Sequence, residues 1–239
     1  MSNLFKCSFD KNKYLIIDLT QPLSTDLEVY PGDPKPSREL FTDIEISGYH
    51  HYIHNIGDHN FCPHIDAPNH QNIDLQDKGV EVFSKENVFT NSCLIDLSNV
   101  EEAEEFEGIK YLLKIEKKHL KKFKEIFFNV ESVLIRTGYD LWIEKNNIHI
   151  KERIPFLDKG AVDFLASFKN LKIVGIDSLT VDPPKEHYAH RKFKNKWIIE
   201  SLVHLYDIPK DSCESFILQV SPIKIIGATG APVVVYAFV

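Results

Sequence analysis

The sequence predicts an α/β fold that forms one domain over residues 1–239. Strand, helix and strand signals alternate between residues 132 and 177, and this order favours at least one parallel pair of strands. Apolar runs interrupted by proline or glycine fill residues 197–238, so the last part of the chain is expected to be mostly sheet. No repeat, low-complexity linker or Gly/Ser tether divides the chain, which favours one domain.

The first half of the chain begins with a buried strand expected at residues 13–19, followed by a loop at 30–36 that holds too many prolines for a strand ladder. Alternating residues near 41–56 and an apolar run at 91–98 predict further strands. Residues 110–124 carry apolar side chains at roughly helical spacing with lysines between them. We interpret this stretch as a helix with a solvated basic face, because an acidic block lies beside it.

The second half predicts a strand at 132–136, a helix around 160–168 and a strand at 171–177. Short glycine-bearing segments at 137–138 and 227–230 lack the spacing of a phosphate-binding loop and are interpreted as turns. Further apolar runs, expected to be sheet, lie at 197–203, 215–220, 222–227 and 232–238.

Composition excludes several classes of function. Lysine and arginine number 28 against 35 aspartates and glutamates, a net charge of −7, which argues against a nucleic-acid partner. The longest apolar runs are about eight residues, far below the roughly 20 that span a bilayer, so no membrane association is expected. The four cysteines are scattered and no secretory signal is recognisable, which predicts reduced thiols and a cytoplasmic location.

Histidine placement is the anomaly of the chain, because six of its 11 histidines lie between residues 50 and 70. Pro63 and Pro68 favour an extended segment between them, in which His64 and Asp66 project to the same face. Pro68 then turns the chain and can bring His70 back over that face, where an acid/base role is natural. The earlier histidines are interpreted as a solvated polar loop: His50, His51, His54 and His59.

A second cluster lies far away in sequence, at residues 187–200. Glu200 follows three apolar residues in a predicted strand, where an ionised carboxylate is costly unless it meets a cation or a metal. The alternative is an outward-pointing glutamate on a half-exposed strand. His190 and Trp197 belong to a basic and aromatic patch that suits a lid over an anionic or aromatic ligand.

These motifs together resemble the cyclase-like metal hydrolases, a family that includes bacterial kynurenine formamidase (arylformamidase) and isatin hydrolase. The family signature reads His-x-Gly-Thr-His-x-Asp-x-Pro-x-His, and this chain supplies its second histidine, aspartate, proline and last histidine. The resemblance runs nearly end to end, through residues 17–22, 29–33, 64–70, 133–138, 174–182, 190–200 and 227–232.

The resemblance implies a swivelling β/β/α architecture, a mixed central sheet or partial barrel flanked by helices, in homodimers or homotetramers. It makes His64, Asp66, His190 and Glu200 metal ligands, with Asp66 able to bridge two ions, and His70 the acid/base. These distant ligands are then expected to meet around a single cation.

Three departures from the family pattern bear on the metal. Asn60 stands where the family has its first histidine ligand, and we assign its amide oxygen to that position. An amide oxygen is a weaker and harder donor than imidazole, so the alternatives are a position that is lost, altered towards manganese or magnesium, or filled by water. Cys62-Pro63 replaces Gly-Thr, and Cys62 is an alternative ligand, although a buried apolar role is the usual one for cysteine. The interval from His190 to Glu200 is shorter than expected, so His187 is a rival to His190, which we prefer.

The expected function is hydrolysis of an aryl-formamide or cyclic amide such as N-formylkynurenine, a step of tryptophan catabolism, with one or two divalent ions as cofactor. Zinc is the expected ion, with manganese as the alternative because an amide oxygen is a hard ligand. Tyr30 and Trp197 are expected to pack against the small-molecule substrate. The alternatives are a metal- or ligand-binding protein that has lost hydrolysis, and a lyase or cyclase acting on a polyketide-like substrate.

Overall fold

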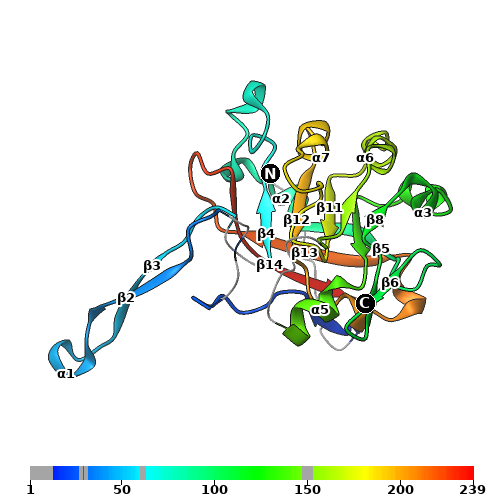
Figure 1. Ribbon diagram of the computed structural model, residues 1–239. Coiled ribbons are helices and arrows are strands. Elements are labelled where there is room, and N and C mark those ends of the chain that lie inside the picture. The colour runs from blue at the N-terminus through cyan, green and yellow to red at the C-terminus, as the bar shows by residue number, and fades with distance from the viewer. Residues whose placement is uncertain (1–12, 27–28, 30–31, 60–62, 147–152) are drawn as a thin grey trace.

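A computed structural model describes residues 13–26, 29, 32–59, 63–146 and 153–239. At its centre seven strands follow one another around a closed ring (Figure 1). An eighth strand, β1 (Ile16–Asp18), pairs with the C-terminal end of β14 (Gly230–Phe238). The predicted mixed sheet or partial barrel is therefore confirmed, and its closure is complete. In ring order the strands are β14 (Gly230–Phe238), β13 (Phe216–Pro222), β5 (Phe89–Asp96), β9 (Ser132–Arg136), β11 (Ile173–Ile176), β12 (Trp197–Glu200) and β4 (His64–Asp66).

The ring has a parallel and an antiparallel part. Strands β5, β9, β11 and β12 run parallel, as the alternating strand and helix signals predict. The remaining pairs, from β12 through β4, β14 and β13 back to β5, are antiparallel. The apolar run at 222–227 is a loop rather than a strand, since the chain leaves β13 at Pro222 and turns at Gly227, whose φ is 79°.

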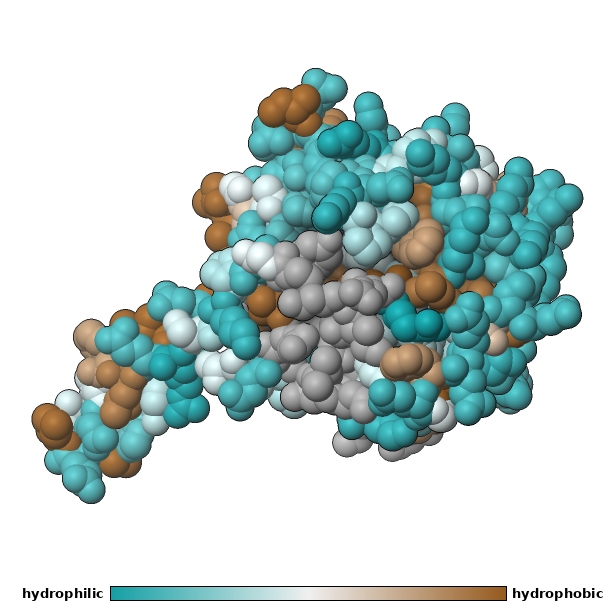
Figure 2. Space-filling model, viewed as in Figure 1, coloured by the Kyte–Doolittle hydropathy of each residue, from teal (hydrophilic) through white to brown (hydrophobic). Residues whose placement is uncertain are grey.

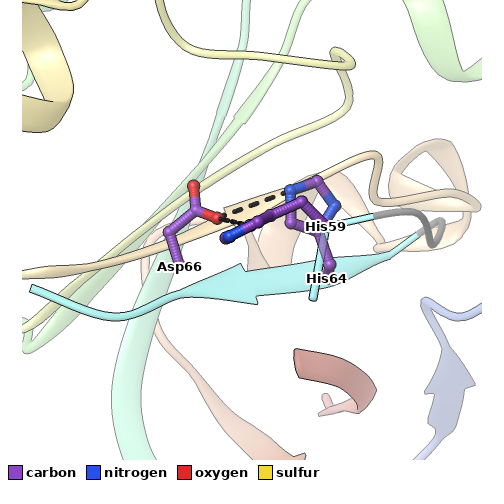
Figure 3. A group of neighbouring side chains, drawn as sticks. All are labelled: His59, His64 and Asp66. Atoms are coloured by element: carbon purple, nitrogen blue, oxygen red, sulfur yellow. Dashed lines mark hydrogen bonds and ion pairs between the residues drawn. The ribbon is translucent and has the colours of Figure 1, made fainter. Parts of the chain in front are cut away.

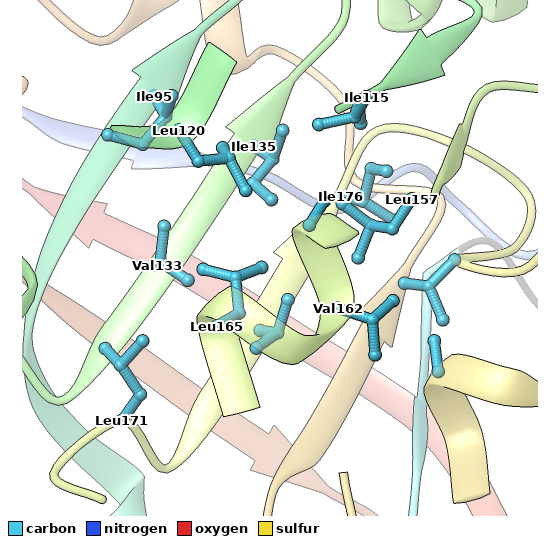
Figure 4. Packing of buried hydrophobic residues seen from close by; sticks show 14 of the residues in the cluster. Ile95, Ile115, Leu120, Val133, Ile135, Leu157, Val162, Leu165, Leu171 and Ile176 are labelled. Carbon is cyan, nitrogen blue, oxygen red and sulfur yellow. The ribbon is translucent and has the colours of Figure 1, made fainter. Parts of the chain in front are cut away.

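Helices cover the outer face of the parallel strands. Helix α6 (Lys159–Ala166) begins at Asp158, whose carboxylate accepts a hydrogen bond from the Ala161 backbone N–H. Its buried face presses Val162 and Leu165 onto the outward side chains of β9 and β11 (Figure 4). Alternate side chains of the same strands point inward and fill the barrel with a second apolar cluster.

The helix predicted at 110–124 is only partly correct. Glu107 and Gly108 both have positive φ and turn the chain into a hairpin of β6 (Glu104–Phe106) and β7 (Ile109–Tyr111). The chain becomes helical only after residue 116. The short elements of this region are β8 (Lys114–Ile115), which pairs with β10 (Phe156–Leu157), α3 (Lys117–Lys121) and α4 (Lys124–Phe127).

A two-stranded ribbon, which we call the arm, comprises residues 37–56 and projects away from the barrel (Figure 1). It consists of β2 (Ser37–Thr42), α1 (Ile44–Ser47) at the tip and β3 (His51–Asn55). The other helices are α2 (Lys85–Val88), α5 (Tyr139–Asn146), α7 (Tyr188–Lys192) and 3-10 turns at Ile73–Leu75, Val80–Val82, Leu205–Asp207 and Lys210–Ser212. Among the described residues no helix is both long and apolar enough to cross a membrane.

Candidate metal centre

Strand register places the first three polar side chains together. In the antiparallel pair β4 and β12, His64 lies directly opposite Glu200, so both side chains leave the same, outer face of the barrel. Asp66 is two residues from His64 on that face. His64 Nε2 lies 3.2 Å from Glu200 Oε2 and 3.5 Å from Asp66 Oδ1. Glu200 is expected to meet a cation or a metal, and the structure places the His64 imidazole against its carboxylate.

Helix α7 supplies His190 above these strands. His190 Nε2 lies 3.1 Å from Asp66 Oδ2 and 3.6 Å from Glu200 Oε1. Its other ring nitrogen, Nδ1, donates to Asp182 at 2.7 Å, and the Asp182 carboxylate also accepts from the backbone N–H groups of Ala189 and His190. Asp182 therefore fixes both the first turn of α7 and the ring that it carries, and it leaves Nε2 facing the centre. The rival His187 is exposed at the rim of the same pocket.

His59 also reaches the centre, whereas the sequence places it in a solvated loop. Its Nδ1 lies 2.7 Å from Asp66 Oδ1 (Figure 3). Its Nε2 lies 2.9 Å from the hydroxyl of Thr229. Asp58 holds Thr229 in place, since the Asp58 carboxylate accepts a hydrogen bond from the Thr229 backbone N–H at 2.7 Å. The interval from His59 to His64 is one residue longer than in the family signature. A search that allowed this one-residue difference would have found His59.

Gly230 shows that space is kept for this imidazole. The residue lies opposite Asp66 in the pair β4 and β14, and a β-carbon there would come within 2.6 Å of His59 Nδ1. The segment 227–230, interpreted from sequence as a turn, thus also forms the floor beneath His59.

His70 lies above the donor atoms rather than among the strands. Its ring centroid is 3.9 Å from that of His59 and 5.4 Å from that of His190. The chain brings it there by a turn after β4, closed by a hydrogen bond from the His70 N–H to the Ala67 carbonyl. The turn after Pro68 is the one that the sequence suggests.

Of the remaining predicted site residues, the structure describes Trp197, which lies away from the metal centre. Trp197 is only 6% exposed and packs edge-on against Phe83 in the barrel interior. It stands three residues from Glu200 in β12 and so points to the opposite face, which removes it from the candidates for substrate contact. Tyr30, Asn60 and Cys62 lie outside the described residues.

Burial and hydrogen bonding shift the protonation of this cluster. Burial alone would raise the pKa of Asp66, but hydrogen bonds from His190 and His59 hold it well below its usual range. Burial alone would lower the pKa of His190, but its bonds to Asp182 and Asp66 raise it well above the ordinary value. Burial lowers the pKa of His70 to about 4, so this imidazole is neutral near pH 7.

The donor set fits a divalent metal ion. Ligand atoms of His59, His64 and Asp66 lie within 4.8 Å of one another, and so do those of Asp66, His70 and His190. Two buried carboxylates concentrate negative charge that a cation would balance, and imidazole with carboxylate suits zinc and manganese alike. Because Thr229 and Asp182 engage the outer nitrogens of His59 and His190, the inner nitrogens face the carboxylates.

A pocket of about 200 Å³ opens over these residues. The metal-binding candidates form its floor, together with His70. Its walls and rim include Asp33, Gln71, Leu179, Thr180, Pro183, Glu186 and His187. Reactive groups at the base of a small pocket can hold a substrate of modest size against a bound ion.

The barrel and this donor set define a metal-dependent hydrolase. The sequence profile of the Cyclase family, described as “Putative cyclase”, matches residues 17–183. Kynurenine formamidase of Bacillus anthracis is 31% identical over 227 residues, which span 91% of this chain and 94% of that protein. Kynurenine formamidase of Bacillus cytotoxicus is 29% identical over 229 residues, with the same coverage. The chain belongs to the Cyclase family.

Solved structures share the fold. Isatin hydrolase A from Labrenzia aggregata, bound to benzyl benzoate, superimposes with a TM-score of 0.77 at 20% identity and covers 95% of this chain and 94% of its own. A predicted metal-dependent hydrolase from Bacillus stearothermophilus gives 0.69 at 22% identity over 94% of this chain and 98% of its own. The barrel and its covering helices are therefore a shared architecture.

Proposed function

We propose that this protein hydrolyses the amide bond of an aryl-formamide, with N-formylkynurenine as the first candidate and a cyclic amide such as isatin as the second. The observation that carries the proposal is the convergence of three imidazoles and two carboxylates beneath a neutral histidine in one pocket. The names of the relatives and structural neighbours, kynurenine formamidase and isatin hydrolase, support the two substrate classes.

His59, His64, Asp66, His190 and Glu200 would hold the metal, whether one ion or two. Zinc is the proposed ion and manganese the alternative, because three imidazole nitrogens favour zinc over the oxygen-preferring magnesium. A bound divalent ion supplies an acidified water and a Lewis acid for the amide carbonyl. His59 takes the place that the sequence assigns to Asn60, so no amide oxygen is needed to complete the donor set.

His70 would move the proton. Burial lowers its pKa to about 4, so the ring is neutral near pH 7 and has a free ring nitrogen that can accept a proton from the attacking water. The same ring can then pass that proton to the nitrogen of the departing amine. His70 is placed for both steps because it stands over the donors at the floor of the pocket.

Two rim carboxylates would orient the substrate. Asp33 and Glu186 line the pocket, and the described lining residues include no lysine or arginine. This rim suits a substrate that carries an ammonium group, as N-formylkynurenine does. This chemistry fits a cytoplasmic enzyme of tryptophan catabolism. Its partner would be a small-molecule substrate, and it would bind neither nucleic acid nor a membrane.

The test is turnover of N-formylkynurenine and of isatin by protein that has been stripped and then reloaded with zinc or manganese. Hydrolysis adds one water to the product mass, which separates it from a lyase or cyclase reaction. His70→Ala should lower kcat by roughly 10²–10⁴-fold while metal content stays unchanged, and His54→Ala on the exposed arm should not. Full turnover in His70→Ala would contradict the proton-transfer role, and metal-loaded protein inert toward both substrates would contradict the proposed activity.

A further inference from the structure

Asn72 is a buried polar residue close to the candidate acid/base, His70. Hydrophilic residues cover much of the molecular surface in the view of Figure 2, where water can satisfy their polar groups. Asn72 is only 8% exposed, so its side-chain amide depends on partners within the protein. It lies two residues beyond His70, directly after the turn that follows β4.

The Asn72 side chain does not cap the helical turn that it precedes. The residue occupies the N-cap position of the 3-10 turn Ile73–Leu75, where an asparagine oxygen commonly accepts a hydrogen bond from a backbone N–H. No such bond forms here, and the turn is closed through the backbone, by the Leu75 N–H donating to the Asn72 carbonyl at 3.0 Å. The side chain is therefore available for other contacts.

The Asn72 amide joins two segments that are far apart in the chain. Its Nδ2 donates to the Pro68 carbonyl at 3.0 Å and to the His190 carbonyl at 3.2 Å. Both partners are acceptors, so the NH₂ end of the amide faces them and both of its protons are used. Pro68 is in the turn that leads to His70, and His190 is in helix α7. Asn72 thus ties this turn to the helix.

The tied segments carry two side chains that meet over the metal centre. The ring centroid of His70 lies 5.4 Å from that of His190, whose Nε2 faces the carboxylate of Asp66. His190 is also fixed without Asn72, because Asp182 accepts from its Nδ1 and from its backbone N–H. His70 is in a turn rather than in a strand, so it depends more on the tie. Loss of the Asn72 amide should displace His70 and leave His190 in place.

We propose that Asn72 is a positioning residue for His70, whose amide ties the turn to α7 and so sets where the acid/base stands over the metal centre. The inference rests on the proposed function, which gives His70 the proton-transfer role. Asn72 does not belong to the described lining of the pocket, so it acts through His70 rather than on the substrate. A reacting group displaced by about 1 Å can cost about 10²-fold in rate.

The first test compares Asn72→Ala with Asn99→Ala, which removes an amide from an exposed position. Asn72→Ala should lower kcat by about 10–100-fold for the substrate that wild type hydrolyses, with KM and metal content within about 2-fold of wild type. Asn72→Asp should lose at least as much, because it keeps the size of the side chain but turns an oxygen toward two carbonyls. Asn99→Ala should match wild type. Full kcat in Asn72→Ala, or loss of the metal with the amide, would overturn the proposal.

Adding Asn72→Ala to His70→Ala separates positioning from a general structural role. If Asn72 acts through His70, the double variant should turn over at the rate of His70→Ala alone, because the two changes then remove the same contribution. A further loss of about 10-fold in the double variant would show that Asn72 supports another group, and the proposal would fail.

Amide hydrogen exchange of the zinc-loaded protein without substrate provides a readout that needs no activity. In Asn72→Ala, residues 67–76 should exchange at least about 10-fold faster than in wild type, while α7 keeps its protection. Unchanged exchange at residues 67–76 would overturn the proposal. If wild type is inert toward both substrates and the exchange difference is present, the proposed function fails while the tie between the turn and α7 stands.

Discussion

Glu200 Oε2 lies 3.2 Å from His64 Nε2 because the two residues are directly opposed in the antiparallel pair β12 and β4. The same carboxylate accepts a hydrogen bond from the Val181 backbone N–H through Oε1 at 2.8 Å. A buried glutamate is thus held at both oxygens and faces the imidazoles of His64 and His190. This pairing joins the two halves of the candidate metal centre, which are distant in sequence.

Replacing Glu200 by glutamine should lower metal affinity by at least about 10-fold. The substitution keeps the shape but removes a negative charge, and it places an amide NH₂ toward either His64 or the Val181 N–H. Metal content after dialysis, measured by elemental analysis, gives the result. Glu105→Gln on exposed β6 is the control and should retain metal. A Glu200→Gln protein with undiminished affinity would remove Glu200 from the ligand set.

His59 and His54 provide a comparison within one histidine-rich segment. His59 contacts Asp66 and Thr229, whereas His54 is exposed on the arm. We expect His59→Ala to lower zinc affinity by about 10–100-fold, because it deletes the imidazole nitrogen that lies 2.7 Å from Asp66. Titration with zinc measures this, and His54→Ala should match wild type. Equal zinc affinities in the two variants would show that His59 is not a metal ligand.

Asp182 is a positioning residue for His190, and its effect should appear in metal binding even without substrate. Asp182→Asn retains an acceptor for the α7 backbone but weakens the bond that orients the His190 ring. The expected result is a loss of about 10–100-fold in metal affinity with little change in thermal stability. Calorimetric metal titration measures the loss, and Asp211→Asn in the exposed turn Lys210–Ser212 controls for removal of a charge. An unchanged titration would mean that α7 holds the ring without this carboxylate.

Local patterns in the sequence predict the strands and one face of the centre. Alternation alone places His64 and Asp66 together, and the cost of burying Glu200 predicts a charged or metal partner. The same alternation places Trp197 on the face opposite to Glu200, in the barrel interior and away from the pocket. Alternation also cannot show which strands are neighbours, and the register of β4 between β12 and β14 decides which side chains meet.

His59 shows a different limit. Its place depends on contacts with Asp58, Thr229 and the bare backbone at Gly230, residues that are up to about 170 positions away in the chain. Nothing in the local composition distinguishes His59 from His54, which lies five residues earlier on the arm. Closure of the barrel between β14 and β4, a long-range event, brings these groups together.

Lys196 is a buried lysine outside the metal centre, and it should make the free energy of unfolding depend on pH. Only 7% exposed, its ammonium donates to the carbonyls of Phe168 and Leu171, both at 2.7 Å. Burial lowers its pKa from 10.5 to about 8. Between these two pKa values the unfolded chain binds more protons than the folded chain, so the free energy of unfolding rises with pH. Below about pH 8 the lysine is charged in both states, and the full cost of burying the charge lowers the stability of the folded chain.

Urea unfolding of wild type and Lys196→Met between pH 7 and pH 10 checks this, because methionine keeps the stem and removes the charge. Relative to the variant, wild type should gain about 1 kcal/mol of unfolding free energy for each pH unit above roughly pH 8. The exposed neighbour provides the control, since a Lys194→Met protein should differ from wild type by a constant amount. Parallel curves for wild type and Lys196→Met would show that the two carbonyls hold the ammonium at its ordinary pKa.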